Sequence, residues 1–258
     1  MMELIISKEN GVATLKLNRP EVFNSFNQKM AFDLQKALDD CEKDETIRCI
    51  VISGEGKAFC AGQDLAEATD PNGPELKSIV KDHYNPIIVR LRNIEKPIIA
   101  AVNGVAAGAG ANIALACDIV FAKESASFIQ AFSKIGLIPD SGGTFMLPRL
   151  IGWQKASALM MTGDKVSAIE AVAMNMIYKA IPDLEFYETI STFATRMAQM
   201  PTKGLGITKR ALNASLTNNL EEQLAVEGKL QTEAGSTHDF NEGTQAFLEK
   251  RLPDFKGR

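Results

Sequence analysis

Short apolar segments alternate with helical patterns through the first half of the chain. The segments Leu4–Ser7 and Val12–Asn18 flank Asn10-Gly11, a dipeptide typical of two-residue turns, and therefore predict an antiparallel hairpin. Three other segments are mostly apolar and predict buried strands, at residues 47–53, 98–102 and 119–122. Because strands of this kind need cover on both faces, these segments indicate parallel strands enclosed by helices.

Helical periodicity occupies the intervals between these strands. One apolar helix face is predicted by four residues at helical spacing, Met30, Leu34, Leu38 and Cys41. The stretch 33–45 carries six carboxylates and two lysines, so the outer face of that helix is acidic. Two more helices are expected in this half, over residues 75–94 and 108–116.

The second half of the chain is predicted to be helical. A capping residue stands three positions before a carboxylate in three motifs, Ser167-x-x-Glu170, Asn219-x-x-Glu222 and Ser236-x-x-Asp239. They predict helices near residues 168–175, 220–234 and 239–251, the last one ended by Pro253. No linker rich in Gly, Ser or Pro occurs near residue 190, so we expect a core over residues 1–190 and a packed helical region over 191–258.

Composition narrows the classes of protein that this sequence can represent. Of its 258 residues, 45% are hydrophobic and 23% are charged, which is ordinary for a folded chain and excludes a disordered one. The net charge of −4 argues against nucleic-acid binding, because nucleic-acid-binding proteins need a basic surface. Residues 97–117 are uncharged over a length that could span a membrane, but glycine and asparagine interrupt them, so no membrane insertion is expected.

Cysteine and histidine are few and scattered. The four cysteines have no Cys-x-x-Cys spacing and only two histidines occur, so we expect neither a metal site nor a disulfide framework. The first residues lack the basic and apolar regions of a signal peptide. Together these features predict a cytoplasmic protein, in a reducing compartment.

No motif for a nucleotide cofactor or a catalytic triad is complete. Gly108-x-Gly110 suggests a dinucleotide fingerprint, but Ile113 stands where the third glycine would be needed. His83 lies in a polar helical stretch and is expected at the surface or behind a site. Ser141 is expected to support a helix start rather than to act as a nucleophile.

Two glycine-rich loops, Phe59–Leu65 and Asn103–Gly110, each follow a predicted strand. Small side chains let a ligand approach the backbone closely, and free N–H groups at loop or helix starts attract negative charge. Two such groups directed at one oxygen would form an oxyanion hole. The alternative, that glycine and alanine merely allow tight packing here, stays open on spacing alone.

A third motif places a carboxylate at a turn. Asp140 follows Pro139 and precedes Ser141-Gly142-Gly143. One interpretation is a plain helix N-cap, and the other is a catalytic carboxylate held on a sharp turn with exposed backbone. A helix N-terminus would lower the pKa of this carboxyl, whereas burial beside Phe132 and Leu137 would raise it.

Together these motifs resemble the enoyl-CoA hydratase/isomerase family, or crotonase superfamily. The resemblance runs from Leu17-Asn18-Arg19-Pro20 to Pro253, and within the family it is strongest to isomerases that rearrange an epoxidised aryl-acetyl-CoA. It implies an α/β fold with a crotonase-like spiral of ββα turns as the acyl-CoA-binding core (1–190). It also implies that the helical C-terminal region (191–258) mediates assembly into a homotrimer or a dimer of trimers.

The resemblance implies site residues as well. The oxyanion-hole amides would be those of Ala61 and Ala109, and Asp140 would be the acid and base. Lys250 would meet the coenzyme A phosphates of the same or a neighbouring subunit. No metal or other cofactor is implied, because coenzyme A is part of the substrate. The residues expected to contact the substrate are Glu21, Val22, Gly62, Gln63, Asp64, Leu65, Tyr84, Gly108, Asn112, Phe132, Pro139 and Lys250.

The sequence departs from the family's hydratases at two positions. Those enzymes activate water with two glutamates, and the matching positions here hold Asn112 and Phe132, neither of which can act as a base. The expected activity is therefore an isomerase that converts 3-enoyl-CoA to 2-enoyl-CoA, or rearranges a ring-epoxide aryl-acetyl-CoA, with Asp140 as acid and base. A 2-enoyl-CoA hydratase is the alternative enzyme. A non-catalytic acyl-CoA-binding or RNA-binding protein is the alternative of another class, and the acidic helix disfavours RNA.

Overall fold

The N-terminal hairpin forms as predicted in the computed structural model, which describes residues 2–258. β1 (Leu4–Glu9) pairs antiparallel with β2 (Val12–Leu17). Asn10 and Gly11 between them have φ angles of 50° and 77°, the left-handed pair that this type of turn requires. The prediction from the Asn-Gly dipeptide is confirmed.

The hairpin forms one edge of a six-stranded sheet. The other four strands are β3 (Cys49–Gly54), β5 (Ile98–Val102), β7 (Ile119–Lys123) and β10 (Lys179–Ile181). The strand order is β1-β2-β3-β5-β7-β10, and every neighbouring pair from β2 onward is parallel. All residues of β3 and β5 are buried, as expected for apolar strands covered on both faces.

A smaller sheet contains four short strands. They are β4 (Ala58–Cys60), β6 (Val105–Ala107), β8 (Ser127–Ile129) and β9 (Lys165–Ser167), in the order β4-β6-β8-β9. The first three are parallel to one another, and β9 is antiparallel to β8. Each of β4, β6 and β8 follows a strand of the larger sheet after a short turn, and helical segments then lead onward. This repeated strand–strand–helix unit is the spiral of ββα turns, so the predicted α/β fold class is confirmed.

Helical segments of the first half lie between the strands. They are η1 (Pro20–Val22), α1 (Gln28–Lys43), α2 (Leu65–Ala68), α3 (Leu76–Ser78), η2 (Ile79–Tyr84), α4 (Asn85–Asn93) and α5 (Ala109–Ala116). The apolar face predicted for α1 is buried. The single helix expected over residues 75–94 is instead α3, η2 and α4 in succession, because η2 is a π-helical turn that interrupts the α-helical hydrogen bonding.

The uncharged stretch 97–117 lies inside the protein. It forms β5, β6 and α5, and every residue of α5 is buried. No helix within residues 2–258 is both long enough and apolar enough to cross a membrane.

Eight more helical segments follow in the second half. They are η3 (Ala131–Ile135), α6 (Gly143–Ile151), α7 (Trp153–Thr162), α8 (Ala168–Ala173), α9 (Phe186–Gln199), α10 (Thr202–Ser215), α11 (Leu220–Gly235) and α12 (His238–Glu249). Ser167 and Asn219 begin α8 and α11 with the predicted capping boxes. The cap predicted at Ser236 is wrong by one residue, because the Thr237 side chain accepts the Phe240 N–H.

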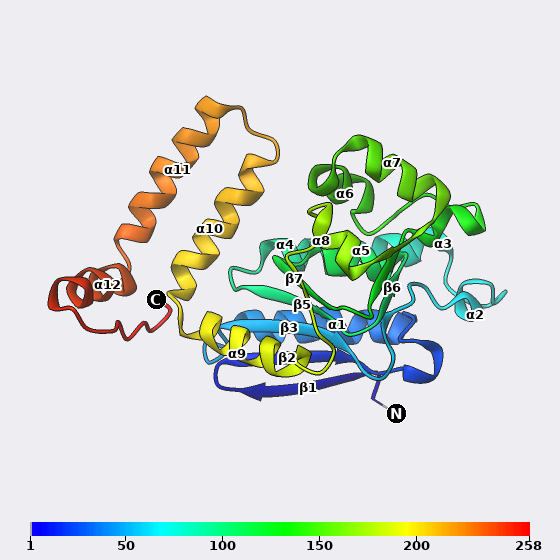
Figure 1. The fold of residues 1–258 in the computed structure, drawn as a ribbon, viewed down its shortest axis with the longest axis horizontal. Coiled ribbons are helices and arrows are strands. Elements are labelled where there is room, and N and C mark those ends of the chain that lie inside the picture. The colour runs from blue at the N-terminus through cyan, green and yellow to red at the C-terminus, as the bar shows by residue number, and fades with distance from the viewer. Residues whose placement is uncertain (1) are drawn as a thin grey trace.

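The C-terminal helices (α10, α11 and α12) extend beyond the sheets, to the left in Figure 1, with α10 and α11 side by side. α9 instead packs on the larger sheet and buries Ile190, Ala194 and Ala198 there. The division predicted after residue 190 falls within α9. The division of the chain into 1–190 and 191–258 stays a prediction.

A buried polar network joins α10 to the core. Lys209 Nζ lies 2.8 Å from Asp118 Oδ2, and the lysine side chain is only 7% exposed. The same carboxyl oxygen accepts the Ile98 N–H at 2.9 Å. Beside this pair, Arg92 Nη2 donates to Asn213 Oδ1 on α10 at 2.6 Å. Burial lowers the pKa of Lys209, so the ammonium depends on Asp118 as its counter-charge.

We expect Asp118→Asn to lower the free energy of unfolding by about 3 kcal/mol, because it leaves the buried Lys209 ammonium without that counter-charge. The matched control is Asp33→Asn, which removes the exposed partner of Lys29 and should cost less than about 1 kcal/mol. Urea denaturation of both variants measures the difference. Equal losses would contradict the dependence of α10 on the buried pair.

Candidate active site

The two glycine-rich loops meet at the start of α5. A Cβ added at Gly62 would lie 3.0 Å from the Ala107 carbonyl oxygen and 3.6 Å from the Ala109 nitrogen. Gly62 also has a φ of +96°, a conformation that favours glycine. The loop after β4 therefore lies directly against the helix N-terminus that follows β6.

The Ala61 amide does not point into this meeting place. Its N–H donates to the Phe23 carbonyl oxygen at 3.0 Å. This bond occupies the N–H that was expected in the oxyanion hole, so the geometry does not support Ala61 in that role. The local cause is the pairing of this loop with the segment after η1.

The backbone N–H groups that remain at this point are those of Gln63 and of the first residues of α5, beginning with Ala109. The residues on either side of Gln63 pair with Phe26. The Phe26 N–H donates to the Gly62 carbonyl oxygen at 2.7 Å, and the Phe26 carbonyl oxygen accepts the Asp64 N–H at 2.8 Å. Across residues 2–258 the Gln63 N–H itself has no acceptor. Ala109 is the first residue of α5, and a helix leaves its first N–H groups without intrahelical partners. The sequence predicts Gln63 as a substrate contact but gives no sign of its backbone amide as a donor.

The Gly108 N–H, unlike that of Ala109, is hydrogen-bonded to another strand. It donates to the Ile129 carbonyl oxygen at 2.9 Å, which fixes the loop on β8. The Phe132 ring lies beside it, with one ring carbon 3.8 Å from where a Gly108 Cβ would be. Phe132 is buried and contributes an apolar wall next to Ala109.

Asp140 lies on the turn before α6 but does not cap that helix. The helix begins at Gly143 with Gly142 as N-cap and no side-chain cap bond, so the N-cap prediction is wrong. The physical reason is that Ser141 and Gly142 both adopt left-handed φ angles, 51° and 73°, which turn the chain away before the helix starts. The carboxyl accepts the Ser141 hydroxyl at 2.8 Å through Oδ1.

Burial shifts the pKa of Asp140. It raises the pKa of this carboxyl above its ordinary value, and the hydrogen bond from Ser141 opposes the rise without cancelling it. Burial therefore outweighs the lowering of the pKa that a helix N-terminus would cause. A half-buried carboxyl with a raised pKa is suited to take up and return a proton.

Asn112 lies one turn inside α5 and is only 1% exposed. Its Nδ2 donates to the Asp140 carbonyl oxygen at 2.9 Å, and its Oδ1 accepts from Gln130 Nε2 at 2.9 Å. Both ends of the amide are therefore engaged by protein groups. At the positions of Asn112 and Phe132 no side chain can act as a base.

Tyr84 is fully buried at the end of the π-helical turn. Its hydroxyl donates to Gln63 Oε1 at 2.7 Å, and its ring contacts Phe26 edge to face. Burial raises the pKa of Tyr84, and the charge of Asp140 contributes to the rise. Tyr84 therefore holds the Gln63 side chain at the edge of the site.

The remaining predicted contacts divide by exposure. Asp64 pairs with Arg19 at 2.8 Å and caps α2, so its carboxyl is engaged. Glu21, Val22 and Leu65 are exposed nearby, and Pro139 is half-buried beside an apolar cleft of about 530 Å³.

Lys250 follows α12, which Figure 1 shows on the far side of α10 and α11 from α5. Within one chain, Lys250 does not join the other predicted residues.

His83 does not lie at the surface, one of the two places predicted for it. Its ring is buried and contacts Phe32 edge to face, with centroids 5.3 Å apart. Burial lowers the pKa of His83. Nowhere in the described part of the chain do three His, Cys, Asp or Glu side chains gather as a metal ion would require.

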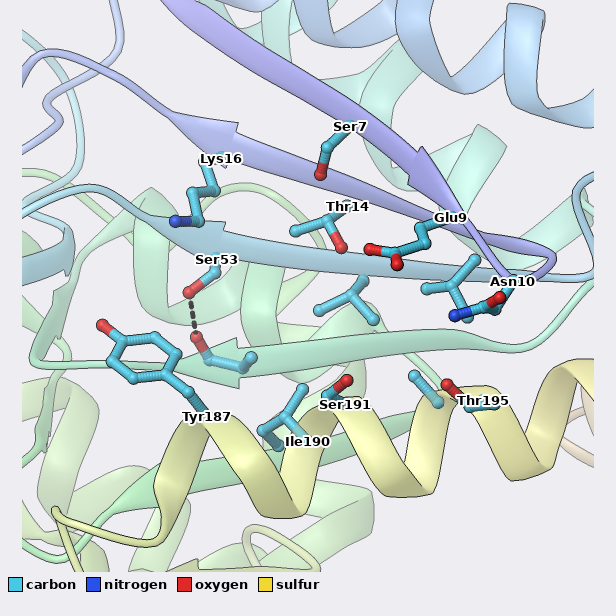
Figure 2. A pocket seen from close by; sticks show the side chains of 14 residues that line it. Ser7, Glu9, Asn10, Thr14, Lys16, Ser53, Tyr187, Ile190, Ser191 and Thr195 are labelled. Carbon is cyan, nitrogen blue, oxygen red and sulfur yellow. Dashed lines mark hydrogen bonds between the residues drawn. The ribbon is translucent and has the colours of Figure 1, made fainter.

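A second cavity lies on the other face of the larger sheet. Figure 2 shows it between α9 and the sheet strands β1, β2, β3 and β5, with Glu9, Thr14 and Lys16 on the strands and Tyr187 and Ser191 on α9. The cavity measures about 160 Å³ and contains none of the predicted site residues. The predicted site residues therefore lie elsewhere, around the start of α5.

Known proteins are similar to this chain along its whole length. A sequence model of the family described as Enoyl-CoA hydratase/isomerase matches residues 7–258. The chain is 48% identical over 262 residues to the 1,2-epoxyphenylacetyl-CoA isomerase of Escherichia coli, and the match covers 100% of both chains. It is 37% identical to the 2,3-dehydroadipyl-CoA hydratase of the same organism, again over 100% of both.

A solved structure is similar in fold as well. The enoyl-CoA hydratase of Bacillus anthracis superposes with a TM-score of 0.92 at 31% sequence identity, covering 100% of both chains. This likeness and the family match agree with the ββα spiral. The chain therefore belongs to the enoyl-CoA hydratase/isomerase family, the crotonase superfamily of enzymes that act on acyl-CoA thioesters.

Proposed function

We propose that this enzyme is an acyl-CoA isomerase. The Gln63 and Ala109 amides bind the thioester carbonyl oxygen, and Asp140 moves a proton from C2 to C4 of the acyl group. The reaction converts a 3-enoyl-CoA into a 2-enoyl-CoA. It consumes no cofactor, because coenzyme A is part of the substrate.

The chemistry follows from the acidity of the proton next to a thioester. When that proton leaves C2, negative charge develops on the carbonyl oxygen as an enolate. One backbone donor at such an oxygen typically contributes about 10²–10³ in rate. The partial positive charge at the start of α5 acts in the same direction on Ala109.

The observation that carries the proposal is the state of Asp140. It is a half-buried carboxyl with a raised pKa, and within residues 2–258 Ser141 is the one other residue that donates a hydrogen bond to it, at Oδ1. Other carboxyls close in sequence to the motifs are engaged: Asp64 pairs with Arg19 and Asp118 with Lys209. The Glu67 carboxylate accepts the Gln28 N–H and the Gln63 side-chain amide. Asp140 is therefore the group best suited to exchange protons with a substrate.

Rearrangement of a ring-epoxide aryl-acetyl-CoA is a second substrate choice for the same residues. The relative at 48% identity is named for an epoxyphenylacetyl-CoA. Polarisation of the thioester carbonyl by the two amides, with Asp140 as acid and base, would also serve to expand an epoxidised ring. A 2-enoyl-CoA hydratase is the alternative function, favoured by the names of other relatives.

Parallel incubations distinguish isomerase from hydratase. We expect the enzyme to convert 3-enoyl-CoA to 2-enoyl-CoA and to hydrate crotonyl-CoA very weakly, because Asn112 and Phe132 cannot activate water. Chromatography of both reactions measures the products. Hydration at the roughly 10–10³ per second of efficient enzymes would favour the hydratase instead.

Asp140→Asn should fold normally and bind acyl-CoA with near-native affinity. The Ser141 hydroxyl can still donate to the amide oxygen, but the side chain can no longer take up a proton. We expect isomerisation to slow by at least about 100-fold. A variant that isomerises 3-enoyl-CoA at the native rate would contradict the role of Asp140 as base.

The same variant tests the pH dependence. Because burial raises the pKa of Asp140, the folded protein holds this proton more tightly than the unfolded chain does. The protonated carboxyl is therefore favourable for folding at low pH, and that contribution is lost as the pH rises through the raised pKa. Wild-type activity should fall as the pH drops through this pKa, while Asp140→Asn should be at least as stable as wild type at neutral pH in thermal unfolding.

We also propose that the C-terminal helices assemble the enzyme into a homotrimer or a dimer of trimers. These helices and the residues just after α12 expose a set of large apolar side chains whose burial would favour association: Leu212, Leu220, Leu224, Phe240, Phe247, Leu248 and Leu252. Assembly would also let Lys250 reach the coenzyme A phosphates bound to a neighbouring subunit. Light scattering should give three or six times the chain mass of 28.0 kDa, and a monomer would contradict the proposal.

A further inference from the structure

The Asn112 amide connects the two halves of the proposed site. We infer that Asn112 is a positioning residue that holds the Asp140 turn at a fixed place relative to the Ala109 N–H. This inference rests on the proposed isomerase activity. It assigns a role to Asn112, which occupies the position where the family's hydratases carry a glutamate.

The turn at Asp140 is fixed through its backbone. The Asp140 carbonyl oxygen accepts two hydrogen bonds, from Asn112 Nδ2 and from the Gly143 N–H, both at 2.9 Å. A Cβ at Gly143 would lie 2.3 Å from Asn112 Nδ2, so the first residue of α6 is packed directly on the amide. The turn cannot shift without breaking this contact.

The direction of each amide in the network follows from the carbonyl. Since a C=O only accepts, Asn112 must present its NH₂ group to Asp140 and its oxygen to Gln130. Gln130 then presents its own NH₂ group to Asn112 at 2.9 Å. The Gln130 oxygen is left buried without a partner among the described residues, an unfavourable arrangement that the fold retains.

The other end of the network is the proposed oxyanion hole. Gln130 follows Ile129, whose carbonyl oxygen accepts the Gly108 N–H at 2.9 Å. Asn112 is on the same helix as Ala109, three residues later, and a helix rises about 1.5 Å per residue. One rigid turn of α5 therefore sets the distance between the donor that binds the carbonyl oxygen and the turn that carries the base.

This distance matters because one base must serve two carbons. Asp140 takes the proton from C2 and returns it to C4, so a shift of the turn changes the two transfers unequally. A displacement of about 1 Å can cost about 10²-fold in rate. A carboxylate at position 112 could activate water but could not donate to the Asp140 carbonyl. One residue at this position therefore cannot both hold the turn and activate water.

The test compares two reactions of the same substrate in D₂O. Wild type and Asn112→Leu are incubated with a 3-enoyl-CoA, and NMR follows deuterium entering C2 and the appearance of the 2-enoyl product. We expect isomerisation by Asn112→Leu to fall about 100-fold and the ratio of C2 exchange to isomerisation to change by about tenfold or more. The dissociation constant of butyryl-CoA, which cannot isomerise, should stay near the wild-type value.

Gln35→Leu is the matched control. Gln35 is another buried amide, and its Nε2 donates to the Asp82 and His83 carbonyl oxygens at 2.8 and 3.0 Å. Its removal should reduce stability without changing the ratio, because a general loss of stability lowers both reactions alike.

Three results would overturn the inference. The first is a wild-type ratio of C2 exchange to isomerisation in folded Asn112→Leu, and the second is the same change of that ratio in Gln35→Leu. If Asn112→Leu does not fold, Asn112→Asp replaces it, since it keeps the size of the side chain but cannot donate to the Asp140 carbonyl. The third result is that neither variant folds, which would make Asn112 a structural requirement and not a positioning residue. A wild-type enzyme without isomerisation or exchange would overturn the proposed function itself.

Discussion

Close contact between the loop after β4 and the start of α5 is the constraint on which the site depends. A Cβ at Gly110 would lie 2.5 Å from the Cys60 carbonyl oxygen and 2.7 Å from its sulfur, so no larger residue fits there. Together with Gly62, this glycine lets peptide groups from two successive turns of the spiral lie side by side. A pair of amides can then face one oxygen without burying a charged side chain. The parallel sheets and the helices around them maintain that contact.

The fold could be predicted from the sequence wherever a local rule and the tertiary contacts agree. The Asn10-Gly11 turn and the capping residues Ser167 and Asn219 are such cases, because each satisfies backbone groups within a few residues. The periodic apolar face of α1 is another. The π-helical turn η2 was missed because its residues carry the pattern of an ordinary helix, and only tertiary packing around Tyr84 distinguishes it.

The sequence predicts which loops form the candidate site, but not which backbone N–H groups in those loops are free to bind a ligand. The motifs around Gly62, Gly108 and Asp140 do meet near the start of α5. Which amide is available depends instead on pairing with a distant segment, as the bond between Ala61 and Phe23 demonstrates. The failed N-cap prediction for Asp140 has a similar cause, since the left-handed angle of Ser141 has no signal in its side chain. The roles assigned to Gln63, Ala109 and Asp140 are proposals for this reason.

The C-terminal helices have a consequence for the lifetime of the protein. Few of their side chains are buried in their own chain, Ile207, Leu230 and Ala246 among them, and neither apolar core includes them. A segment of this kind gains much of its stability from whatever covers it, and that gain grows with the concentration of the covering molecule. If a second copy covers it, dilution exposes these helices to proteases long before the sheets unfold. Abundance in the cell would then determine how long each chain survives, independently of how tightly its core is packed.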